Sequence, residues 1–367
     1  MDYCRVTNGS NNHGNNQNGF LLSYEVDTVQ FDGNIRTDSI SCYGAGTLGT
    51  TKGKDDVLKK LIPNMKNISM IGIGVTEAGL SSVSSKAVQD FCDLLYTCYK
   101  YMIVEKTLSC ENPNGKICVV CTDNIPNSGD LLKGYMIEIA KEKSHLFVDN
   151  NGKDDKTFES PSKKCRVEQQ NMGSIITFEE FLTQRVTFHN TMVDRITSER
   201  DGSNGMVPRA EPVPAKAIVI EDLNGDLPRS FTLDDTQKQF GVVVRTKKGQ
   251  LSGDIALKLR VANGTHTAAA HLMALSKILM TDKLSSQSDE AALIMAYLDA
   301  LFKNQILPAA EKLYGMEETK AVYEDWRGRL IHAHFGLSTF FITQNGAAKG
   351  GIRLGPTIRS LFDQQKV

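Results

Sequence analysis

The chain lacks any apolar run of the roughly 18 residues that a membrane-spanning helix needs. Its first residues, MDYCRVTNGSNN, also lack the hydrophobic segment of a secretory signal. Charge of one sign is not in excess, since 42 lysines and arginines balance 43 aspartates and glutamates and leave a net charge of -1. Such a surface offers no electrostatic footprint for nucleic acid or an anionic membrane. We therefore expect a cytoplasmic protein that handles a small molecule.

Cysteine is present but shows no pattern of structural or metal-binding use. Eight cysteines are scattered through 367 residues, a chain too large to need disulfide stapling, which fits reduced thiols in the cytosol. Cys118 and Cys121 form a CxxC pair, yet no second pair and no histidine pair has the spacing of metal ligands. The pair lies in the apolar run ICVVC, which predicts a buried strand with these two side chains on opposite faces. We expect neither zinc nor redox chemistry there.

The order of apolar segments predicts a parallel sheet in the first half of the chain. Residues 1–19 are rich in Asn and Gly and predict a disordered tail. From residue 20 onward, short strand-like apolar runs alternate with amphipathic helical stretches. In order, the segments are FLLSYEV, SISCY, DDVLKKLI, ISMIGIGV, SSKAVQDFCDLLYTCYKYMI and KICVVCT. Alternation of strand and helix is typical of a parallel sheet flanked by helices.

The middle of the chain contains the expected domain junction. A helix is predicted over residues 129–143 and a polar loop over 148–171, and TFEEFLTQRVTFHNTMVDRIT then returns to helix before a short apolar passage. The Gly- and Pro-rich segment DGSNGMVPRAEPVP follows and places the junction near Pro212. Beyond it, AKAIVIED and FGVVVRT predict strands. Helical apolar spacing begins near Asp254 and continues almost to the end.

These elements together predict an α/β fold class. An incomplete Rossmann-type parallel-sheet domain is expected over residues 20–212, followed by a mainly helical substrate domain over 213–367. The composition, with 40% hydrophobic and 23% charged residues, is that of an ordinary globular chain. In such an arrangement a ligand is expected in the cleft between the two domains.

A glycine pattern near the start imitates a dinucleotide-binding loop. Gly44, Gly46 and Gly49 in YGAGTLG follow a strand-like run and match the spacing GxGxxG. The third glycine of that fingerprint opens a helix at once, so that the helix N-terminus holds the pyrophosphate. Here TTKGKDD separates the glycine from a helix predicted to be capped near Asp55. We interpret YGAGTLG as a surface loop.

Three residues suited to proton transfer lie close together in KLRVANGTH. Lys258, Asn263 and His266 are separated by five and three residues, so on a single helix they fall within an arc of roughly 140°. A lysine with a lowered pKa can act as general base, an amide can donate to a developing oxyanion, and an imidazole can orient either partner. An exposed lysine, a capping asparagine and a satisfied histidine would give the same spacing, so this triad needs support from other segments.

That support comes from segments spread along residues 20–367. They are VTEAG (75–79), CTDNIPNSG (121–129), FHNTMVDRIT (188–197), VIED (219–222), KLRVANGTH (258–266) and NGAAKGGIRLGPTIR (345–359). With these segments in this order, the chain resembles the polyol-specific long-chain dehydrogenases, the group of mannitol 2-dehydrogenase and the fructuronate and tagaturonate reductases. The resemblance implies a metal-independent enzyme of carbohydrate metabolism that uses NAD or NADP. Its partner would be a small sugar alcohol or keto-sugar, and we expect a monomer or weak homo-oligomer.

The resemblance also implies a role for the residues around the triad. Lys258 matches the family's general acid/base, which takes the hydroxyl proton as hydride leaves the carbon. Asn190 and Asn263 match the two amides that hold the reacting oxygen. His266 matches the substrate-binding histidine. Burial of the lysine in the cleft would lower its pKa, because desolvation disfavours the ammonium.

More distant positions match the family less specifically. Lys349 matches a basic residue that contacts distal substrate hydroxyls, and Asp222 matches an acidic one. By position alone, the residues expected near the nicotinamide are Thr76, Glu77, Asp123 and Asn124. These residues do not decide between NAD and NADP. The residue that distinguishes the two cofactors at the ribose lies, in the family, in or just after an N-terminal glycine-rich segment for which this chain has no counterpart.

Departures from the family pattern leave several functions open. The family begins with a strand, a glycine-rich GxGxFHRxHQ-like loop and a helix, for which we find no counterpart, so we expect a truncated sequence or nucleotide binding through the strand ends alone. Ile255, beside Asp254, replaces an acidic residue, and Phe341 replaces an arginine near the distal substrate site. A mannitol- or fructose-type polyol is therefore the first expectation. A hexuronate is an alternative substrate, and an impaired homologue that only binds substrate is an alternative function.

Overall fold

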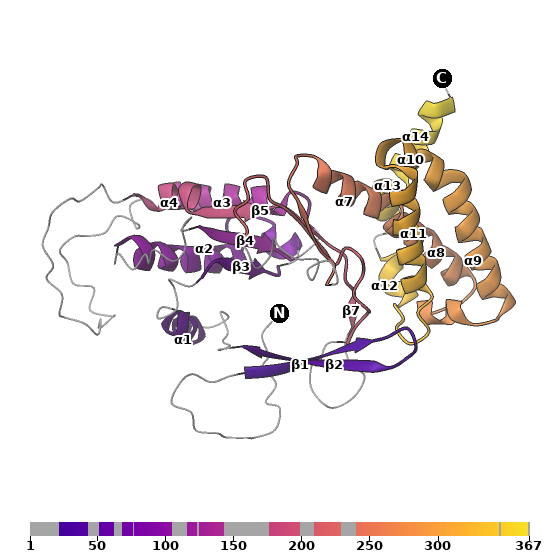
Figure 1. The fold of residues 1–367 in the computed structure, drawn as a ribbon, viewed down its shortest axis with the longest axis horizontal. Coiled ribbons are helices and arrows are strands. Elements are labelled where there is room, and N and C mark those ends of the chain that lie inside the picture. Colours follow the sequence, from indigo (N-terminus) through magenta and orange to yellow (C-terminus); the bar gives the residue numbers. More distant parts are fainter. Residues whose placement is uncertain are drawn as a thin grey trace, which may run out of the picture.

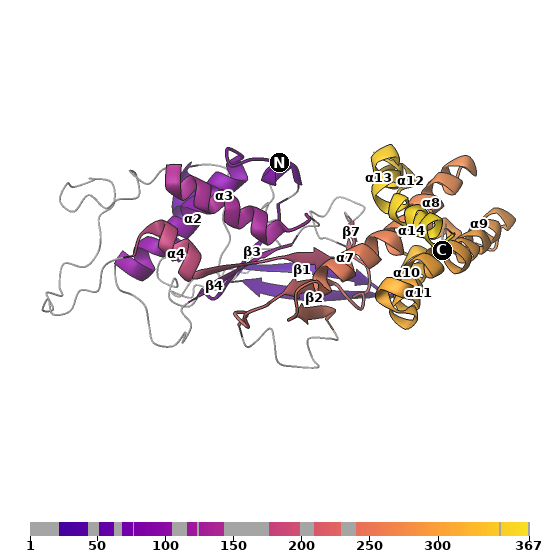
Figure 2. The ribbon, with the colours of Figure 1, turned by 90° about the horizontal axis from the view of Figure 1, so that it is seen from above.

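The computed structural model describes the chain over residues 22–42, 51–61, 68–75, 77–104, 116–122, 125–142, 176–198, 209–228, 240–344 and 346–365. Within these ranges, small β-sheets and their helices form the first half, and a group of helices forms the second (Figures 1 and 2). The predicted α/β fold class is confirmed. The predicted tail over 1–19 and loop over 148–171 lie outside the described residues. In the described part, no helix is both long and apolar enough to span a bilayer.

A three-stranded parallel sheet forms the core of the first half. Its strands, in spatial order, are β3 (Met70–Ile73), β4 (Ile117–Cys121) and β5 (Val186–His189). All five residues of β4 are buried, as expected for a strand covered on both faces. Cys121 packs in the cluster on the helix-covered face and Cys118 in the cluster on the opposite face. The prediction of opposite faces for the CxxC pair is therefore confirmed.

Three helices cover one face of this sheet. They are α2 (Lys86–Tyr99), α3 (Ser128–Glu142) and α4 (Phe178–Gln184), and their apolar side chains share one core with β4. A capping box starts α4, because the Thr177 hydroxyl accepts from the Glu180 backbone N–H while the Glu180 carboxylate accepts from Thr177. The predicted helix over 129–143 corresponds to α3 and is confirmed.

A second small sheet covers the other face. Its strands, in spatial order, are β10 (Val242–Arg245), β9 (Ile218–Glu221) and β6 (Thr191–Val193). Ile220 of β9 packs against Cys118 and Val120 of the parallel sheet, and Lys116 pairs with Asp226 at 2.7 Å. The apolar passage after the predicted helix of TFEEFLTQRV is thus strand β5 running directly into β6, with only Asn190 between them. The domain boundary near residue 212 stays a prediction.

The first two strands do not join the parallel sheet, so that part of the sequence prediction is wrong. β1 (Leu22–Val29) and β2 (Ile35–Cys42) form an antiparallel hairpin. β1 also pairs with β8 (Arg209–Ala210), which pairs with β7 (Thr197–Ser198). The turn chemistry explains the hairpin, because Gly33 has φ +85° and the Asp32 carboxylate accepts from the Asn34 backbone N–H at 2.9 Å.

Helix α1 (Thr51–Leu61) begins earlier than the sequence predicted. The expected gap of several residues between Gly49 and the helix is therefore absent, and this argument against a dinucleotide-binding loop is wrong. The loop itself lies in residues 43–50, outside the described residues. The strand before it, β2, pairs antiparallel with β1 and not with β3. That pairing still differs from a dinucleotide fingerprint, which needs a strand of the parallel sheet at this place.

The second half of the chain is helical, as predicted from Asp254 onward. Its helices are α7 (Gln250–Arg260), α8 (Ala262–Leu275), α9 (Asp289–Leu301), α10 (Leu307–Tyr314), α11 (Met316–Leu330), α12 (Thr339–Thr343), α13 (Gly346–Arg353) and α14 (Gly355–Gln365). Short 3-10 or π-helical segments lie at Glu77–Leu80, Lys100–Val104, Thr281–Ser285 and Phe302–Ile306. Side chains of α7, α8, α9 and α11 share one apolar core.

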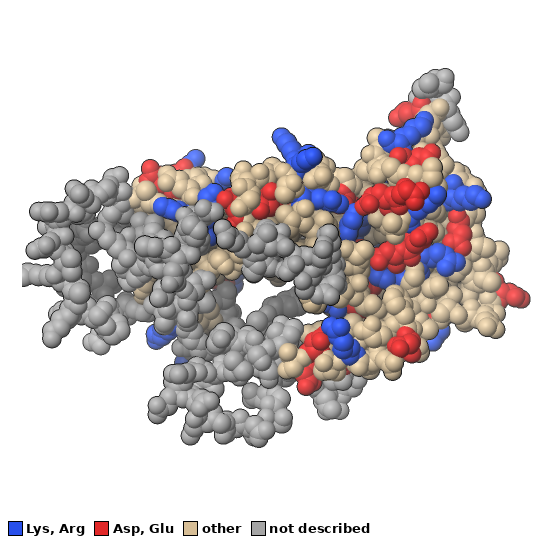
Figure 3. Space-filling model, in the orientation of Figure 1, with Lys and Arg blue, Asp and Glu red and all other residues tan. Residues whose placement is uncertain are grey.

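The N-terminal hairpin reaches this helical half. Val29 at the end of β1 offers its carbonyl oxygen to the His332 imidazole at 3.2 Å, and the Phe31 and His332 rings lie 4.8 Å apart. On the face drawn in Figure 3, acidic and basic side chains are interspersed over the helical half. Contacts between the two halves therefore come from the hairpin as well as from the strands that follow β5.

Candidate active site

The predicted triad lies where two helices meet and not on one helix. Lys258 is in the last turn of α7, whereas Asn263 and His266 are in the first turns of α8. Val261 joins the helices with φ −82° and ψ −70°, and its side chain is fully buried in the helical core. Its N–H still donates to the Leu257 carbonyl oxygen at 2.8 Å. The prediction of a single helical face is therefore corrected to a bend at Val261.

Lys258 lies at the contact between the helices and the strands. Its ammonium donates to the Val193 carbonyl oxygen at 2.5 Å and lies 3.2 Å from Asp194 Oδ1. The side chain is 11% exposed. Burial lowers the pKa of Lys258, Asp194 opposes that shift, and the positive charges of Arg329 and Arg353 add to it. A lysine in this environment can both release and take up a proton.

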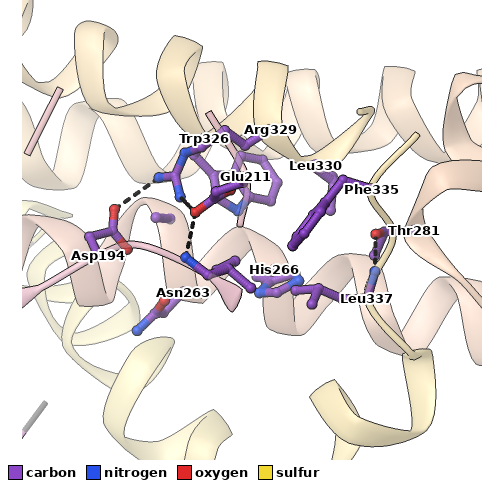
Figure 4. A pocket seen from close by; sticks show the side chains of 12 residues that line it. Asp194, Glu211, Asn263, His266, Thr281, Trp326, Arg329, Leu330, Phe335 and Leu337 are labelled. Atoms are coloured by element: carbon purple, nitrogen blue, oxygen red, sulfur yellow. Dashed lines mark hydrogen bonds and ion pairs between the residues drawn. The ribbon is translucent and has the colours of Figure 1, made fainter. Parts of the chain in front are cut away.

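An ion-pair network extends from this lysine into the helical half. Arg329 of α11 donates to Asp194 Oδ2 at 2.8 Å and to Glu211 Oε1 at 3.1 Å (Figure 4). It also pairs with Asp325. The guanidinium and the Glu211 carboxylate are both almost fully buried. Positive and negative groups therefore alternate from Lys258 through Asp194 and Arg329 to Glu211.

Glu211 is held by the backbone as well as by the arginine. Its Oε1 accepts from the Ile196 N–H at 2.7 Å. Burial raises the pKa of Glu211 to about 7, although Arg329 and the Ile196 hydrogen bond act in the opposite direction. The carboxyl group therefore titrates near neutral pH, in direct contact with the arginine that also binds Asp194.

A pocket opens between this network and helices α8 and α11. Its polar end is lined by Asp194, Glu211, Arg329, Asn263 and His266, with the Trp326 ring beside them, and its other end is lined by Leu330, Phe335, Leu337 and Thr281 (Figure 4). The cavity volume is about 40 Å³, room for a few water molecules or for one hydroxymethyl group. The cavity is therefore too small to hold a whole sugar.

His266 presents a neutral imidazole to this pocket. Desolvation lowers the pKa of His266 to about 4, and the positive charges of Arg353, Arg329 and Lys349 contribute to the shift. The ring lies edge-on to Trp326, with centroids 6.4 Å apart. At neutral pH the imidazole can therefore donate one hydrogen bond and accept another, as recognition of a hydroxyl requires.

Asn190 is placed away from the pocket. Its carboxamide oxygen accepts from the backbone N–H groups of Gly129 and Asp130 at 3.0 and 3.2 Å, and its NH₂ donates to the Asp130 carboxylate. These are the first N–H groups of α3, so Asn190 supplies the helix cap from a distant strand end. Its predicted role in holding the reacting oxygen stays a prediction.

The two distal residues also have structural partners. Asp222 is buried and accepts from the backbone N–H groups of Asp226 and Leu227, which closes the turn after β9. Lys349 donates to the Ile342 carbonyl oxygen at 2.9 Å. Neither residue lines the pocket, but the Lys349 charge acts on His266. Their roles toward substrate therefore stay predictions.

The carboxyl edge of the parallel sheet is where a nicotinamide dinucleotide would lie. Of the residues predicted there, Thr76, Asp123 and Asn124 lie outside the described residues, and for Glu77 only the backbone is described. Gly74 after β3 and Thr122 after β4 are exposed at this edge, and a Cβ on Gly74 would come within 3.1 Å of the Thr122 hydroxyl. Both residues are exposed, so this part of the edge is accessible to a ligand, although the Thr122 hydroxyl occupies the space directly beside Gly74. The N-terminus of α3 is filled by Asn190 and does not fit a pyrophosphate.

Sequence reasoning missed Glu211 and Arg329 and did not single out Asp194. Asp194 lies inside FHNTMVDRIT, a segment that was already linked to the site. Glu211 lies in PRAEPVP, which its prolines marked as a junction, and an acidic residue between two prolines was the available signal. Arg329 is one of several charged residues of α11 and carried no distinguishing signal in the sequence.

We expect the titration of Glu211 to appear in the pH dependence of stability. Its pKa is raised from 4.5 to about 7 in the folded protein, so between these values the folded state holds a proton that the unfolded state has lost. Glu211 therefore makes the folded state less stable as pH rises from 5 to 7, by about 3 kcal/mol at most. Glu211→Gln removes this dependence.

The measurement is the free energy of urea unfolding of both proteins between pH 5 and 8. The difference, wild type minus Glu211→Gln, should fall as pH rises to 7 and then stay constant. His266 acts in the opposite sense, because its lowered pKa removes stability as pH falls from 6.5 toward 4. That contribution is common to both proteins and largely cancels. A difference that does not vary with pH would contradict the titration of Glu211.

Similar folds are found among solved structures of dehydrogenases. No family model and no curated protein matches the sequence. Among solved structures, the chain is similar to a D-sorbitol dehydrogenase in substrate-free form, with a TM-score of 0.63 and 15% identity over 94% of this chain and 66% of that one. It is also similar to Pseudomonas fluorescens mannitol 2-dehydrogenase in ternary complex with NAD and D-mannitol, with a TM-score of 0.53 and 14% identity over 94% and 64%.

At this level of sequence identity, the comparisons show a shared fold. The chain shares the two-part architecture of the polyol dehydrogenases, a parallel-sheet part followed by a helical part. It spans about two thirds of the length of either solved relative.

Proposed function

We propose that the protein is an oxidoreductase that interconverts a secondary alcohol of a polyol and the corresponding ketone, with Lys258 as general acid/base. The observation that carries the proposal is the place of the Lys258 amine, buried at 11% exposure against Val193 and Asp194, in a fold shared with polyol dehydrogenases. Asp194 both pairs with Lys258 and lines the pocket. Asp194 therefore links the lysine to the polar end of the pocket, whose lining does not include Lys258 itself.

The chemistry proceeds through a proton held at Lys258 Nζ. In oxidation, the neutral amine takes the hydroxyl proton as the C–H bond breaks, and in reduction the ammonium returns a proton to the new alkoxide. Desolvation and the neighbouring arginines bring the neutral amine within reach by lowering its pKa. Asp194, at 3.2 Å from Nζ, holds the ammonium form in place once the proton has been transferred.

Asn263 and His266 would orient the reacting alcohol. Both side chains line the polar end of the pocket, where an amide NH₂ can donate to the oxygen on which negative charge develops. The neutral His266 can donate to the same oxygen or accept from a neighbouring hydroxyl. Trp326 and Leu330 line the wall beyond and exclude water from the reacting carbon.

The hydride acceptor would be a nicotinamide dinucleotide, which supplies the two-electron step when it is bound. One support is the NAD in the Pseudomonas fluorescens mannitol 2-dehydrogenase complex. The other is the exposure of Gly74 and Thr122 at the ends of β3 and β4, where a parallel sheet offers its ligand-binding edge. Thr76, Glu77, Asp123 and Asn124 are proposed to contact it as well, on their position in the sequence.

The test is a spectrophotometric assay of the purified protein with NAD⁺ and with NADP⁺. We expect D-sorbitol or D-mannitol to produce reduced nicotinamide, read at its absorbance maximum, and the matching ketose to consume it. The absence of turnover with both cofactors, across a panel of polyols, keto-sugars and hexuronates, would overturn the proposal. A fluorescence titration with the reduced nicotinamide cofactor then separates two alternatives. A homologue that only binds substrate should not bind the cofactor, whereas an enzyme that acts on a different substrate should bind it.

A further inference from the structure

The carboxylate of Asp194 is shared by two cations. Its Oδ1 lies 3.2 Å from Lys258 Nζ, and its Oδ2 accepts from Arg329 Nη2 at 2.8 Å. All three side chains are largely buried, so solvent screens their charges only weakly. The attraction between Asp194 and Lys258 therefore depends on how much of the guanidinium charge falls on Asp194.

The guanidinium of Arg329 is shared in turn. Its Nη1 donates to Glu211 Oε1 at 3.1 Å, and its Nε donates to Asp325 Oδ2 at 3.0 Å. Glu211 is 2% exposed, whereas Asp325 is 33% exposed and solvent screens its charge. Because the guanidinium is a rigid planar fork, its arms toward Glu211 and Asp194 keep a fixed relation. Glu211 is therefore the buried counter-ion that competes with Asp194 for the charge of Arg329 (Figure 4).

Backbone contacts hold Glu211 in this place. Its Oε1 accepts from the Ile196 N–H at 2.7 Å, and its own N–H donates to the Ile196 carbonyl oxygen at 3.2 Å. Arg195 donates to the Glu211 carbonyl oxygen at 3.3 Å. These contacts keep the carboxyl group next to Arg329. Burial raises the pKa of Glu211 to about 7, so both of its protonation states are populated at neutral pH.

The two states of Glu211 act differently on Lys258. When Glu211 is ionised, it neutralises much of the Arg329 charge, and Asp194 can stabilise the ammonium of Lys258. When Glu211 is protonated, more of the Arg329 charge falls on Asp194, which then stabilises the ammonium less and favours the neutral amine. Among the described residues, the other charged or titratable groups that face this network are Arg195, Asp325, Arg353 and His266. His266 is neutral above its pKa of about 4, and the arginines keep their charge, so these groups do not reverse the effect.

We propose that Glu211 is a positioning residue for the acid/base step, because its proton decides, through Arg329 and Asp194, whether Lys258 is held as the ammonium or released as the amine. This inference rests on the proposed function, in which Lys258 exchanges the proton, and adds regulation by pH to that site. No proton moves along the network, since the guanidinium keeps its protons and Glu211 exchanges its own with solvent through the pocket that it lines. Protonation of Glu211 in mild acid thus opposes protonation of Lys258, and oxidation declines less steeply with falling pH than an isolated lysine would allow.

Nuclear magnetic resonance of the protein with ¹³C-labelled lysine tests this coupling without turnover. The ε-carbon signal of Lys258 is the one that is missing from Lys258→Met, and its chemical shift is followed as a function of pH. In the wild type we expect two steps, one near pH 7 as Glu211 ionises and one at the pKa of Lys258 itself. In Glu211→Gln the first step should disappear, and the second should move to lower pH by about 0.5 to 1 unit.

Asp325→Asn is the matched control, because it also removes one carboxylate from Arg329, but at a half-buried position. It should move the Lys258 step less than half as far, since solvent already screens Asp325. A single step in the wild type would overturn the inference, and this measurement stays valid if Glu211→Gln fails to fold. An unshifted Lys258 step in Glu211→Gln, or equal shifts in Glu211→Gln and Asp325→Asn, would overturn it as well.

The enzyme assay separates this inference from the proposed function. In Glu211→Gln the pH profile of kcat for oxidation should move to lower pH by the same amount as the Lys258 step, a change that the loss of a structural contact alone does not produce. Polyol turnover with an unshifted Lys258 titration would leave the proposed function standing and refute the coupling. Coupled titration without nicotinamide turnover would refute the function and support the coupling.

Discussion

Replacing Lys258 with methionine is expected to lower the turnover of the polyol by about 10²- to 10⁴-fold, the usual contribution of a general acid/base. Methionine keeps an unbranched side chain of similar length, whereas the ammonium contacts with Val193 and Asp194 are lost together with the amine. The amine that exchanges the proton is removed. Initial rates with saturating nicotinamide cofactor and varied polyol give kcat and KM, and most of the loss should be in kcat.

The pH profile separates a chemical role of Lys258 from a structural one. Oxidation needs the neutral amine, so the wild-type rate should rise with pH through a pKa below the ordinary 10.5 of lysine. Reduction needs the ammonium and should fall over the same range. In Lys258→Met this dependence should disappear, and the residual rate should be flat.

Lys303→Met is the matched control, because it makes the same chemical change at an exposed position that is not part of the ion-pair network. It should change turnover less than twofold. If Lys258→Met keeps more than a tenth of wild-type turnover, the lysine is not the acid/base. In that case Glu211, whose pKa of about 7 also lies near the working pH, becomes the next candidate.

Sequence periodicity was sufficient to predict the elements of this fold whose pattern is local. The helical half from α7 onward and the buried strand β4 follow from apolar spacing, which acts within a few residues. The hairpin of β1 and β2 was misread because apolar runs of this length suit a parallel or an antiparallel strand equally. The turn at Asp32 and Gly33 decides between them, and the Asp-Gly pair in FDGN was the signal in the sequence, since Gly33 adopts φ +85° there.

The site was harder to predict because its contacts are between distant segments. Arg329 is 135 residues from Asp194 and 118 from Glu211, so no spacing rule links them. Lys258, Asn263 and His266 are close in sequence, and for them the spacing was informative. Even there, the bend between α7 and α8 at Val261 was not predicted. The φ of Val261 is helical, and the bend accompanies burial of its side chain in the helical core, which the local sequence does not reveal.

Replacing Arg329 with methionine is expected to destabilise the fold by about 3–5 kcal/mol, the usual cost of removing one partner from a buried ion pair. The guanidinium is 7% exposed and contacts Asp194, Glu211 and Asp325. Its loss leaves the Glu211 carboxylate, which is 2% exposed, without a counter-ion. Urea unfolding at pH 8, followed by circular dichroism, measures the free energy of unfolding.

The same helix supplies the control for this prediction. Arg327 makes a two-bond contact with Asp299, at 2.7 and 3.0 Å, but both side chains are more than a third exposed. Solvent screens that pair, so Arg327→Met should cost about 1 kcal/mol or less. Equal costs for the two substitutions would show that burial of the Arg329 network contributes nothing to stability.

A double-mutant cycle identifies the group that is responsible for the cost. In Arg329→Met/Glu211→Gln the buried charge and its partner are both removed, so the double mutant should be more stable than the sum of the single effects by about 1–3 kcal/mol. Acid should have a similar effect on Arg329→Met alone, because Arg329 lowers the pKa of Glu211, so in its absence the carboxyl takes up a proton even more readily and the uncompensated charge disappears. If the cost of Arg329→Met is the same at pH 5.5 and pH 8, the stranded charge lies on Asp194 or Asp325, and Glu211 is not the main partner of the arginine.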